Sequence, residues 1–279
     1  MKRKKLNIGV IGIGYLGKYH LEKFINNRQC NTKWAVDSNL DNIVIPSNSS
    51  IKKTTNYKEI LSDIDAISLV TPTKMHYKIA KFFLENKKHV LIEKPMTQTT
   101  LEADKLVKLA KKKKVILQVG HLERFNPVMK KLTKEITNPL FIEVHRLAKF
   151  NPRSTDVNVV FDLMIHDIDI VTTLIGKRIK NISAFGKKII TKSTDIANVR
   201  IEFSGGAIAN LTASRISQKN ERKIRVFEKD KYYSVDFMNS NIKKYIKNTQ
   251  NKKGLFSFKE IQYDKTDALK DEINNFILS

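Results

Sequence analysis

The chain has 279 residues, of which 41% are hydrophobic and 29% are charged, so it can form one large or two ordinary domains with a packed core. No later stretch holds about eighteen uncharged apolar residues, so we expect no membrane span. The single cysteine, Cys30, excludes an internal disulfide and favours a reducing compartment.

The 52 Lys and Arg residues outnumber the 28 Asp and Glu residues, which gives a net charge of +24. One interpretation is a polyanionic partner, and the other is a solvated lysine surface. The lysines are spread along the chain, with basic runs only at 2–5 and 111–114, and no zinc pattern or RNA-binding signature is present. We therefore do not expect nucleic acid binding, although the charge favours phosphorylated substrates and dinucleotides.

The first 120 residues alternate short apolar runs with helical patterns, and the apolar runs read as strands buried on both faces. This alternation predicts a doubly wound parallel sheet of the Rossmann type, with residues 39–54 as a loop holding one short strand. The expected strands are 6–11, 32–37, 65–70, 88–94 and 114–120, and the expected helices are 16–25, 76–86 and 101–112.

The pattern changes near residue 125, and a strand at 140–150 and a helix at 159–175 are followed by β-rich runs. Short connections between consecutive strands predict antiparallel pairing. We expect an α/β domain at 1–122 and an α+β domain at 123–279, the latter an open, mainly antiparallel sheet with helices on one face. The β-rich runs are 179–191, 196–203, 207–215, 223–228 and 231–236.

A G-x-G-x-x-G loop follows the first strand and opens the first helix, and Asp37 ends the second strand. This context predicts a dinucleotide site, with a tight turn, a pyrophosphate at the helix start, and a carboxylate on the adenosine ribose. A carboxylate would repel a 2′-phosphate, so the cofactor is predicted to be NAD. The loop residues are Gly12, Ile13, Gly14, Tyr15, Leu16 and Gly17.

The basic start and apolar run of residues 1–17 also resemble a secretory signal peptide. The glycines have phosphate-loop spacing, and no small-residue cleavage site of the A-x-A type follows. We therefore interpret this run as the first strand and expect a cytoplasmic protein.

Two further strand ends carry polar residues. The segment after the strand at 65–70 brings Thr71, Pro72, Thr73 and His76 to the sheet edge where ligands collect. Glu93 and Lys94 end the next strand, and the following proline fixes the direction of the lysine. A nearby nicotinamide cation would favour a neutral lysine, which suits proton transfer from a hydroxyl.

Asp162, His166 and Asp169 are spaced i, i+4, i+7 and would share one face of an otherwise apolar helix. Three polar groups on such a stripe need partners. His166 is a candidate general base, with Asp162 as the group that orients it. No further Cys or His ligands stand at metal-binding spacing, so we expect no metal.

Together these residues resemble the Gfo/Idh/MocA oxidoreductase family. The matching motifs, in family order, are GIGYLG, Asp37, TPTKMHY, EKP at 93–95, GHLERFNP at 120–127 and D-x-x-x-H-x-x-D at 162–169. The resemblance implies NAD(P)-linked chemistry on a sugar or cyclitol hydroxyl. It places Lys94 and His166 beside the substrate and Glu93 near the nicotinamide ribose, and it implies a homodimer or homotetramer formed through the open sheets.

Some segments, such as ASRIS at 213–217, look like the members that oxidise the 3-hydroxyl of UDP-N-acetylglucosamine on the way to lipid A. A free sugar or inositol as substrate, or a non-catalytic NAD-binding scaffold, are the alternatives. Family members continue beyond the last helix, so the chain reads as shortened at its C-terminus. Candidates for substrate phosphates and hydroxyls are Arg124, Asn126, Arg146, Arg153, Asp169 and Arg215.

Overall fold

The computed structural model of the protein describes residues 5–152, 157–248 and 255–279. The chain forms two compact units, of which unit 1 is Met1–Leu122 with Asp267–Ser279 and unit 2 is Glu123–Thr266. This division differs from our prediction, which placed residues 267–279 in the second domain. They return to unit 1 because the final helix buries its apolar face there.

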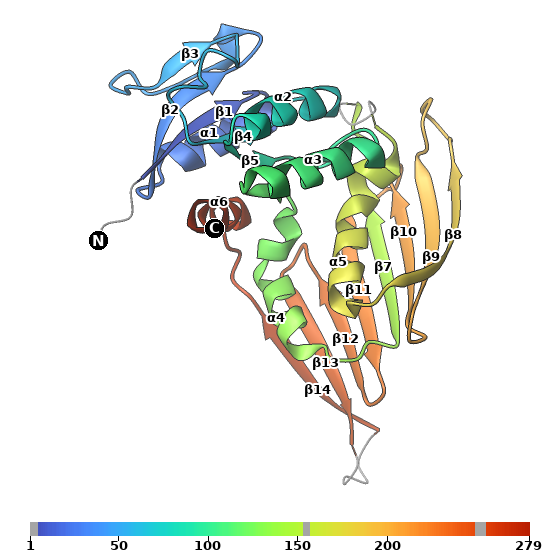
Figure 1. The fold of residues 1–279 in the computed structure, drawn as a ribbon. Coiled ribbons are helices and arrows are strands. Elements are labelled where there is room, and N and C mark those ends of the chain that lie inside the picture. The colour runs from blue at the N-terminus through green and yellow to red at the C-terminus, as the bar shows by residue number, and fades with distance from the viewer. Residues whose placement is uncertain (1–4, 153–156, 249–254) are drawn as a thin grey trace. The chain divides into compact units, whose positions relative to one another are not determined.

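Unit 1 contains a six-stranded sheet with the order β3-β2-β1-β4-β5-β6 (Figure 1). All of its pairings are parallel, which confirms the predicted sheet. The strand order reverses between β1 and β4, and ligands bind at the carboxyl ends of the strands at such a switch point. The strands are β1 (Leu6–Ile11), β2 (Cys30–Val36), β3 (Lys52–Thr54), β4 (Ala66–Leu69), β5 (His89–Ile92) and β6 (Leu117–Val119).

Helices cover both faces of this sheet, and two apolar clusters lie between the layers. Phe83 and Leu106 pack with Ile67 on one face, whereas Phe24 and Phe276 pack with Val10 on the other. The expected helices therefore form where their apolar stripes can be buried. The helices are α1 (Tyr15–Ile25), α2 (Thr73–Glu85), α3 (Thr100–Lys113) and α6 (Ala268–Leu278), with a 3₁₀ turn at Leu40–Asn42.

Unit 2 contains an eight-stranded sheet with the order β14-β13-β12-β11-β7-β10-β9-β8. All pairs are antiparallel except β7 with β10, which are parallel, so the mainly antiparallel sheet is confirmed. We did not predict β13 and β14. The strands are β7 (Phe141–Leu147), β8 (Ile179–Lys187), β9 (Ile196–Phe203), β10 (Ile208–Ser214), β11 (Glu221–Glu228), β12 (Lys231–Asp236), β13 (Asn241–Lys247) and β14 (Phe256–Gln262).

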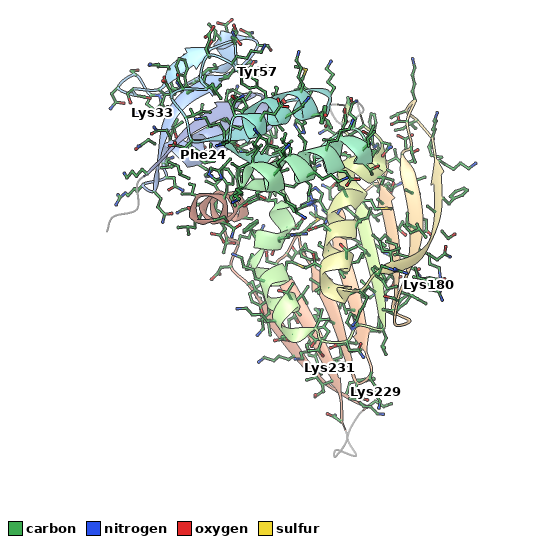
Figure 2. All side chains as sticks on the ribbon, in the orientation of Figure 1. Phe24, Lys33, Tyr57, Lys180, Lys229 and Lys231 are labelled. Carbon is green, nitrogen blue, oxygen red and sulfur yellow. The ribbon has the colours of Figure 1, made fainter. Side chains whose placement is uncertain are left out.

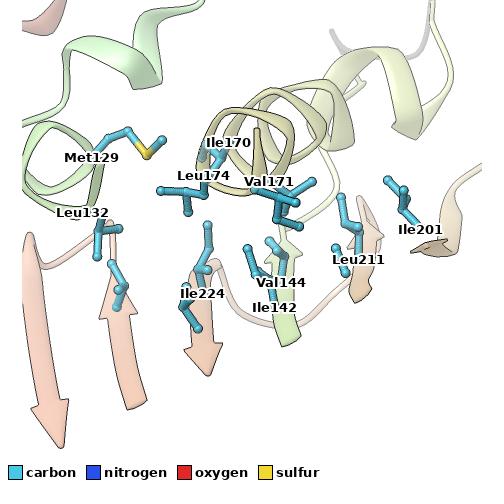
Figure 3. Close-up of a cluster of buried hydrophobic side chains, with 14 of the residues drawn as sticks. Met129, Leu132, Ile142, Val144, Ile170, Val171, Leu174, Ile201, Leu211 and Ile224 are labelled. Atoms are coloured by element: carbon cyan, nitrogen blue, oxygen red, sulfur yellow. The ribbon is translucent and has the colours of Figure 1, made fainter. Parts of the chain in front are cut away.

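One face of this sheet is covered by helices, as predicted. Figure 3 shows Leu132 of α4 and Val171 and Leu174 of α5 above Val144 and Ile224 of the sheet, and all of these residues belong to one buried cluster. The expected helix at 159–175 begins with a π-helical turn, η4, before it becomes regular. The elements are a 3₁₀ turn (Leu122–Phe125), α4 (Pro127–Glu135), η4 (Val160–Met164) and α5 (Ile165–Ile175).

The lysines extend from many separate elements. Figure 2 labels Lys33 on β2, Lys180 on β8, and Lys229 and Lys231 at the turn between β11 and β12. This distribution is typical of a solvated basic surface. Within the described residues, no helix is both long enough and apolar enough to cross a membrane.

Candidate active site

The glycine loop of unit 1 connects β1 to α1 and leaves the start of α1 open. Gly12 has a φ of +89°, and its N–H donates to the carbonyl of Val36 over 2.8 Å. A Cβ atom on Gly17 would lie 1.8 Å from the Gly12 oxygen, so only glycine fits there. Gly14 caps α1 without a side chain, and a Cβ on it would meet no atom within 4 Å. Uncapped N–H groups at an open helix start form an anion site.

Asp37 follows β2 and holds the glycine loop in place. Its Oδ2 accepts from the Ile13 N–H at 2.6 Å, and its Oδ1 accepts from the Asn39 N–H and the Asn42 amide at 3.0 Å. Partial burial raises the pKa of this carboxyl, but the hydrogen bonds from Asn39 and Ile13 outweigh burial and leave the pKa below its usual value. The half-buried side chain is therefore an anion, as acceptance from ribose hydroxyls requires.

The end of β4 is joined to the end of β5 by His76. This side chain is 1% exposed, and its Nδ1 and Nε2 lie 2.9 Å from the Pro95 carbonyl and 2.7 Å from the Thr71 carbonyl. Burial lowers the pKa of the imidazole, and the two carbonyls only partly offset this effect. The structure places His76 between the segments that follow β4 and β5, and its contact with the cofactor stays a prediction.

Thr71 is a better candidate for a ligand contact at the same edge. Its Oγ1 is buried and has no hydrogen-bond partner among the described residues. A buried hydroxyl without a hydrogen-bond partner costs free energy, so binding of a molecule that forms a hydrogen bond with it is favoured. Thr73 begins α2, and Pro72 occupies the cap position, so both lie at the predicted edge.

Glu93 and Lys94 lie just beyond β5, and the Lys94–Pro95 peptide is cis. The Glu93 Oε1 lies 3.1 Å from Nε2 of His20, whose Nδ1 lies 2.9 Å from the Ser68 hydroxyl. The Glu93 Oε2 accepts from the Lys94 N–H at 3.2 Å. Lys94 itself is half-buried at the carboxyl edge of the sheet, where ligands of parallel sheets bind.

Each of the two aspartates predicted beside His166 also contacts an arginine. Asp162 lies in the π-helical turn, and its Oδ2 is 3.9 Å from an Arg215 nitrogen. Asp169 is buried in α5 and binds Arg124, whose Nε and Nη2 donate to its two oxygens over 2.5–3.1 Å. His166 is half-buried in the first turn of α5.

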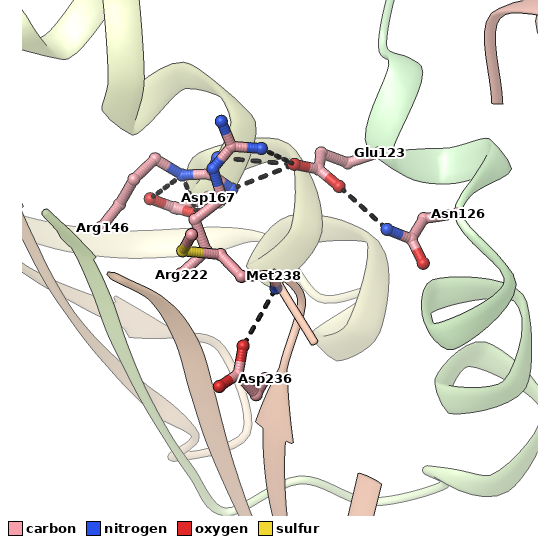
Figure 4. A network of polar contacts seen from close by, with 7 residues as sticks. All are labelled: Glu123, Asn126, Arg146, Asp167, Arg222, Asp236 and Met238. Carbon is pink, nitrogen blue, oxygen red and sulfur yellow. Dashed lines mark hydrogen bonds and ion pairs between the residues drawn. The ribbon is translucent and has the colours of Figure 1, made fainter. Parts of the chain in front are cut away.

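Figure 4 shows a buried network around Arg146. The guanidinium is 3% exposed, donates through Nε to Asp167 at 2.9 and 3.0 Å, and lies 3.4 Å from the Glu123 carboxylate. No sequence pattern pointed to Asp167, which is 2% exposed. Asn126 approaches Glu123 at 3.5 Å and caps α4 through the Val128 N–H. Arg146 was expected at the substrate but is already satisfied within the protein.

The remaining predicted arginines differ in exposure. Arg215 is 3% exposed and donates to the Val157 carbonyl at 2.7 Å, so it secures the loop before η4. The side chain of Arg124 is 52% exposed, and one edge of its guanidinium is bound to the Asp169 carboxylate. Arg153 lies outside the described residues. Arg124 is therefore the arginine of this set best placed to reach a ligand.

A hollow of about 460 Å³ lies at the other edge of the sheet of unit 1, near the starts of β1 and β5. Because ligands of parallel sheets bind at the carboxyl ends, this hollow does not belong to the nucleotide site. Within the described part of the chain, no group of three or more His, Cys, Asp or Glu residues could hold a metal ion.

The open helix start, the ionised Asp37 and the Thr71 hydroxyl fit a dinucleotide and define a Rossmann-type nucleotide-binding protein. Residues 6–121 match the family described as "Oxidoreductase family, NAD-binding Rossmann fold". Residues 137–232 match the "GFO/IDH/MocA C-terminal domain". The chain belongs to the Gfo/Idh/MocA oxidoreductase family, and it is an NAD-dependent oxidoreductase.

Individual relatives support this assignment. The chain is 34% identical to UDP-N-acetylglucosamine 3-dehydrogenase of Acidithiobacillus ferrooxidans, over 98% of this chain and 88% of the relative. A solved structure of that enzyme superposes with a TM-score of 0.90 at 33% identity, covering 99% of this chain and 89% of the other. Myo-inositol 2-dehydrogenase of Thermotoga maritima is 25% identical, over 80% of this chain and 72% of the relative. Levoglucosan dehydrogenase in complex with NADH and levoglucosan shares the fold at 18% identity, covering 98% and 88%, with a TM-score of 0.85.

Proposed function

We propose that the protein oxidises the 3-hydroxyl of a UDP-N-acetylhexosamine such as UDP-N-acetylglucosamine. The observation that carries this proposal is the 34% identity to a UDP-N-acetylglucosamine 3-dehydrogenase over 98% of the chain. The basic character of the chain, with a net charge of +24, favours a substrate that carries a diphosphate.

The residues of the chain have separate roles in the proposed reaction. NAD⁺ supplies a hydride acceptor when it is bound. Lys94, at the end of β5, takes the proton of the hydroxyl in its neutral form, and His166, in α5, is the alternative acceptor of that proton. The hydroxyl carbon loses a hydride and the oxygen loses a proton, so a ketone forms.

Arg124 is the substrate contact that the geometry supports best. Its exposed side chain keeps guanidinium N–H groups available while Asp169 holds its Nε and Nη2. We therefore propose that Arg124 binds a substrate phosphate and that Asp169 positions it. Arg146 and Arg215 are buried and bonded within the protein, so they are weaker candidates for a substrate contact than Arg124.

The alternative substrate class is a free sugar or inositol, which the 25% identity to a myo-inositol 2-dehydrogenase supports. The test is NADH absorbance with NAD⁺ and a panel of UDP-N-acetylglucosamine, free sugars and inositol. Turnover of the UDP-sugar alone supports the proposal, and turnover of inositol alone replaces it. If NAD⁺ binds but no substrate reacts, the protein is a non-catalytic scaffold.

We also propose that the protein pairs with a second copy through the sheet face of unit 2 that the helices leave open. A row of aromatic rings runs across five strands there, with centroid distances of 4.7–5.8 Å. An extended aromatic surface is typical of an interface. A cytoplasmic location and a place in lipid A synthesis stay predictions. The row consists of Phe141, Phe227, Tyr232, Tyr245 and Phe258.

A further inference from the structure

Helix α6 carries a carboxyl group on its buried face. Glu272 is 0% exposed and lies among Ile273, Phe276 and Ile277, which pack against the sheet of unit 1. Neither of its carboxyl oxygens has a hydrogen-bond partner among the described residues. A buried ionised carboxylate without a partner is strongly disfavoured, so this group needs either a proton or a donor.

A chain of polar side chains leads to the same region from the nucleotide site. The Ser68 hydroxyl, the His20 ring and the Glu93 carboxylate follow one another at 2.9 and 3.1 Å. A His20 ring that donates from Nε2 to Glu93 and accepts a hydrogen bond at Nδ1 from the Ser68 hydroxyl satisfies this order. Glu93 is therefore the acceptor at the end of this chain of hydrogen bonds.

Strand β6 brings Glu272 and Glu93 near each other. The Gln118 amide donates to the main-chain oxygen of Glu272 at 3.3 Å, and a Cβ on Gly120 would lie 2.7 Å from a Glu93 oxygen. Burial and, to a smaller extent, the negative charge of Glu93 together raise the pKa of Glu272 to about 8. At neutral pH, Glu272 therefore carries a proton that it can donate.

We propose that Glu272 is a positioning residue for the nucleotide site: its neutral carboxyl donates to Glu93 and fixes the strand end that carries Lys94. The link forms directly after a small side-chain rotation or through one bridging water. Within the described residues, Glu93 is the charged group whose charge affects the pKa of Glu272, and His20 is hydrogen-bonded to Glu93. The hydrogen bond from Glu272 to Glu93 is independent of the proposed function, and only its consequence for Lys94 rests on that function.

The first test compares the stability of the wild type with that of Glu272→Gln as a function of pH. The amide imitates the neutral acid, so the variants should be close in stability near pH 4.5. Between pH 5 and 7.5 the wild type must retain a proton that its unfolded chain releases. The folding equilibrium should then shift in favour of the variant by about tenfold per pH unit. A difference that does not change with pH overturns the proposal.

The second test measures NAD⁺ affinity by calorimetry at pH 7 and needs no sugar turnover. We expect Glu272→Leu, which removes the donor, to weaken binding about tenfold, as loss of a hydrogen bond to a charged group does. Glu272→Gln should bind within about threefold of the wild type, and Ile273→Val, a packing control on the same helix, within about twofold. Wild-type affinity in the Leu variant, or equal weakening in the Leu and Gln variants, contradicts a neutral donor.

Discussion

Asp37 is expected to control both the affinity for NAD⁺ and the preference over NADP⁺. Its carboxylate secures the Ile13 N–H at 2.6 Å and, in the proposed complex, accepts from the adenosine ribose. Loss of hydrogen bonds to a charged group costs about 1.5–3 kcal/mol, which is about tenfold to a hundredfold in the dissociation constant. Asp37→Ala should weaken NAD⁺ binding by this factor. NADP⁺ should be affected less, because the variant no longer repels the 2′-phosphate.

The assay is calorimetric titration of both nucleotides into the wild type and the variant, with thermal unfolding as a check on folding. Asp41→Ala is the matched control, since it removes an exposed carboxylate from the same loop region. The control should bind NAD⁺ within about twofold of the wild type. If Asp37→Ala also binds NAD⁺ that tightly and keeps its preference over NADP⁺, the ribose contact is misassigned.

Three further outcomes are expected. Arg146→Met should lower the free energy of unfolding in urea by about 3–5 kcal/mol, because it leaves the buried Asp167 unpaired, and adding Asp167→Leu should restore most of the loss. Lys94→Ala and His166→Ala should each slow NADH formation about a hundredfold or more while calorimetry shows unchanged NAD⁺ affinity; unchanged rates would refute their roles. Asp195→Asn should cost stability in full above about pH 4, and the cost should shrink progressively as the pH falls below 4, as measured by thermal unfolding across pH.

The sign of the Asp195 effect follows from its surroundings. The side chain is 0% exposed, and its Oδ2 accepts from the N–H groups of Ile189, Ile190 and Thr191 at 2.8–2.9 Å. Burial raises the pKa of this carboxyl, but the hydrogen bonds from Thr191 and its neighbours outweigh burial and lower it well below its usual value. The stabilisation is therefore present above the pKa of the unfolded chain and is lost as the pH falls further. A pH-independent difference between the variants would contradict this assignment.

The architecture of unit 1 follows from local patterns in the sequence. A continuous apolar run such as 6–11 is fully buried only in a strand that is covered on both faces of its sheet. The glycine spacing of the first loop predicted the tight turn in which Gly12 and Gly17 lie. We did not predict strands β13 and β14, because their lysines and glutamates obscure the alternation of apolar and polar residues that is typical of a strand. We did not predict helix α4, because its apolar stripe extends over only nine residues.

The partners of charged side chains could not be predicted from the sequence. Arg124 and Asp169 were predicted as separate substrate contacts, but the fold pairs them with each other. Arg146 finds Asp167 only because β7 and α5 pack together, and spacing along one element cannot reveal such a contact. Glu272 gave one signal that could have been used, since it interrupts the apolar face formed by Ile273, Phe276 and Ile277.

The most direct test of the central claim is the formation of NADH from NAD⁺ and UDP-N-acetylglucosamine by the purified protein, with product analysis by NMR. We expect NADH in equal amount to a product with a keto group at position 3 of the sugar. Oxidation of inositol or a free sugar with no reaction of the UDP-sugar would contradict the proposed function.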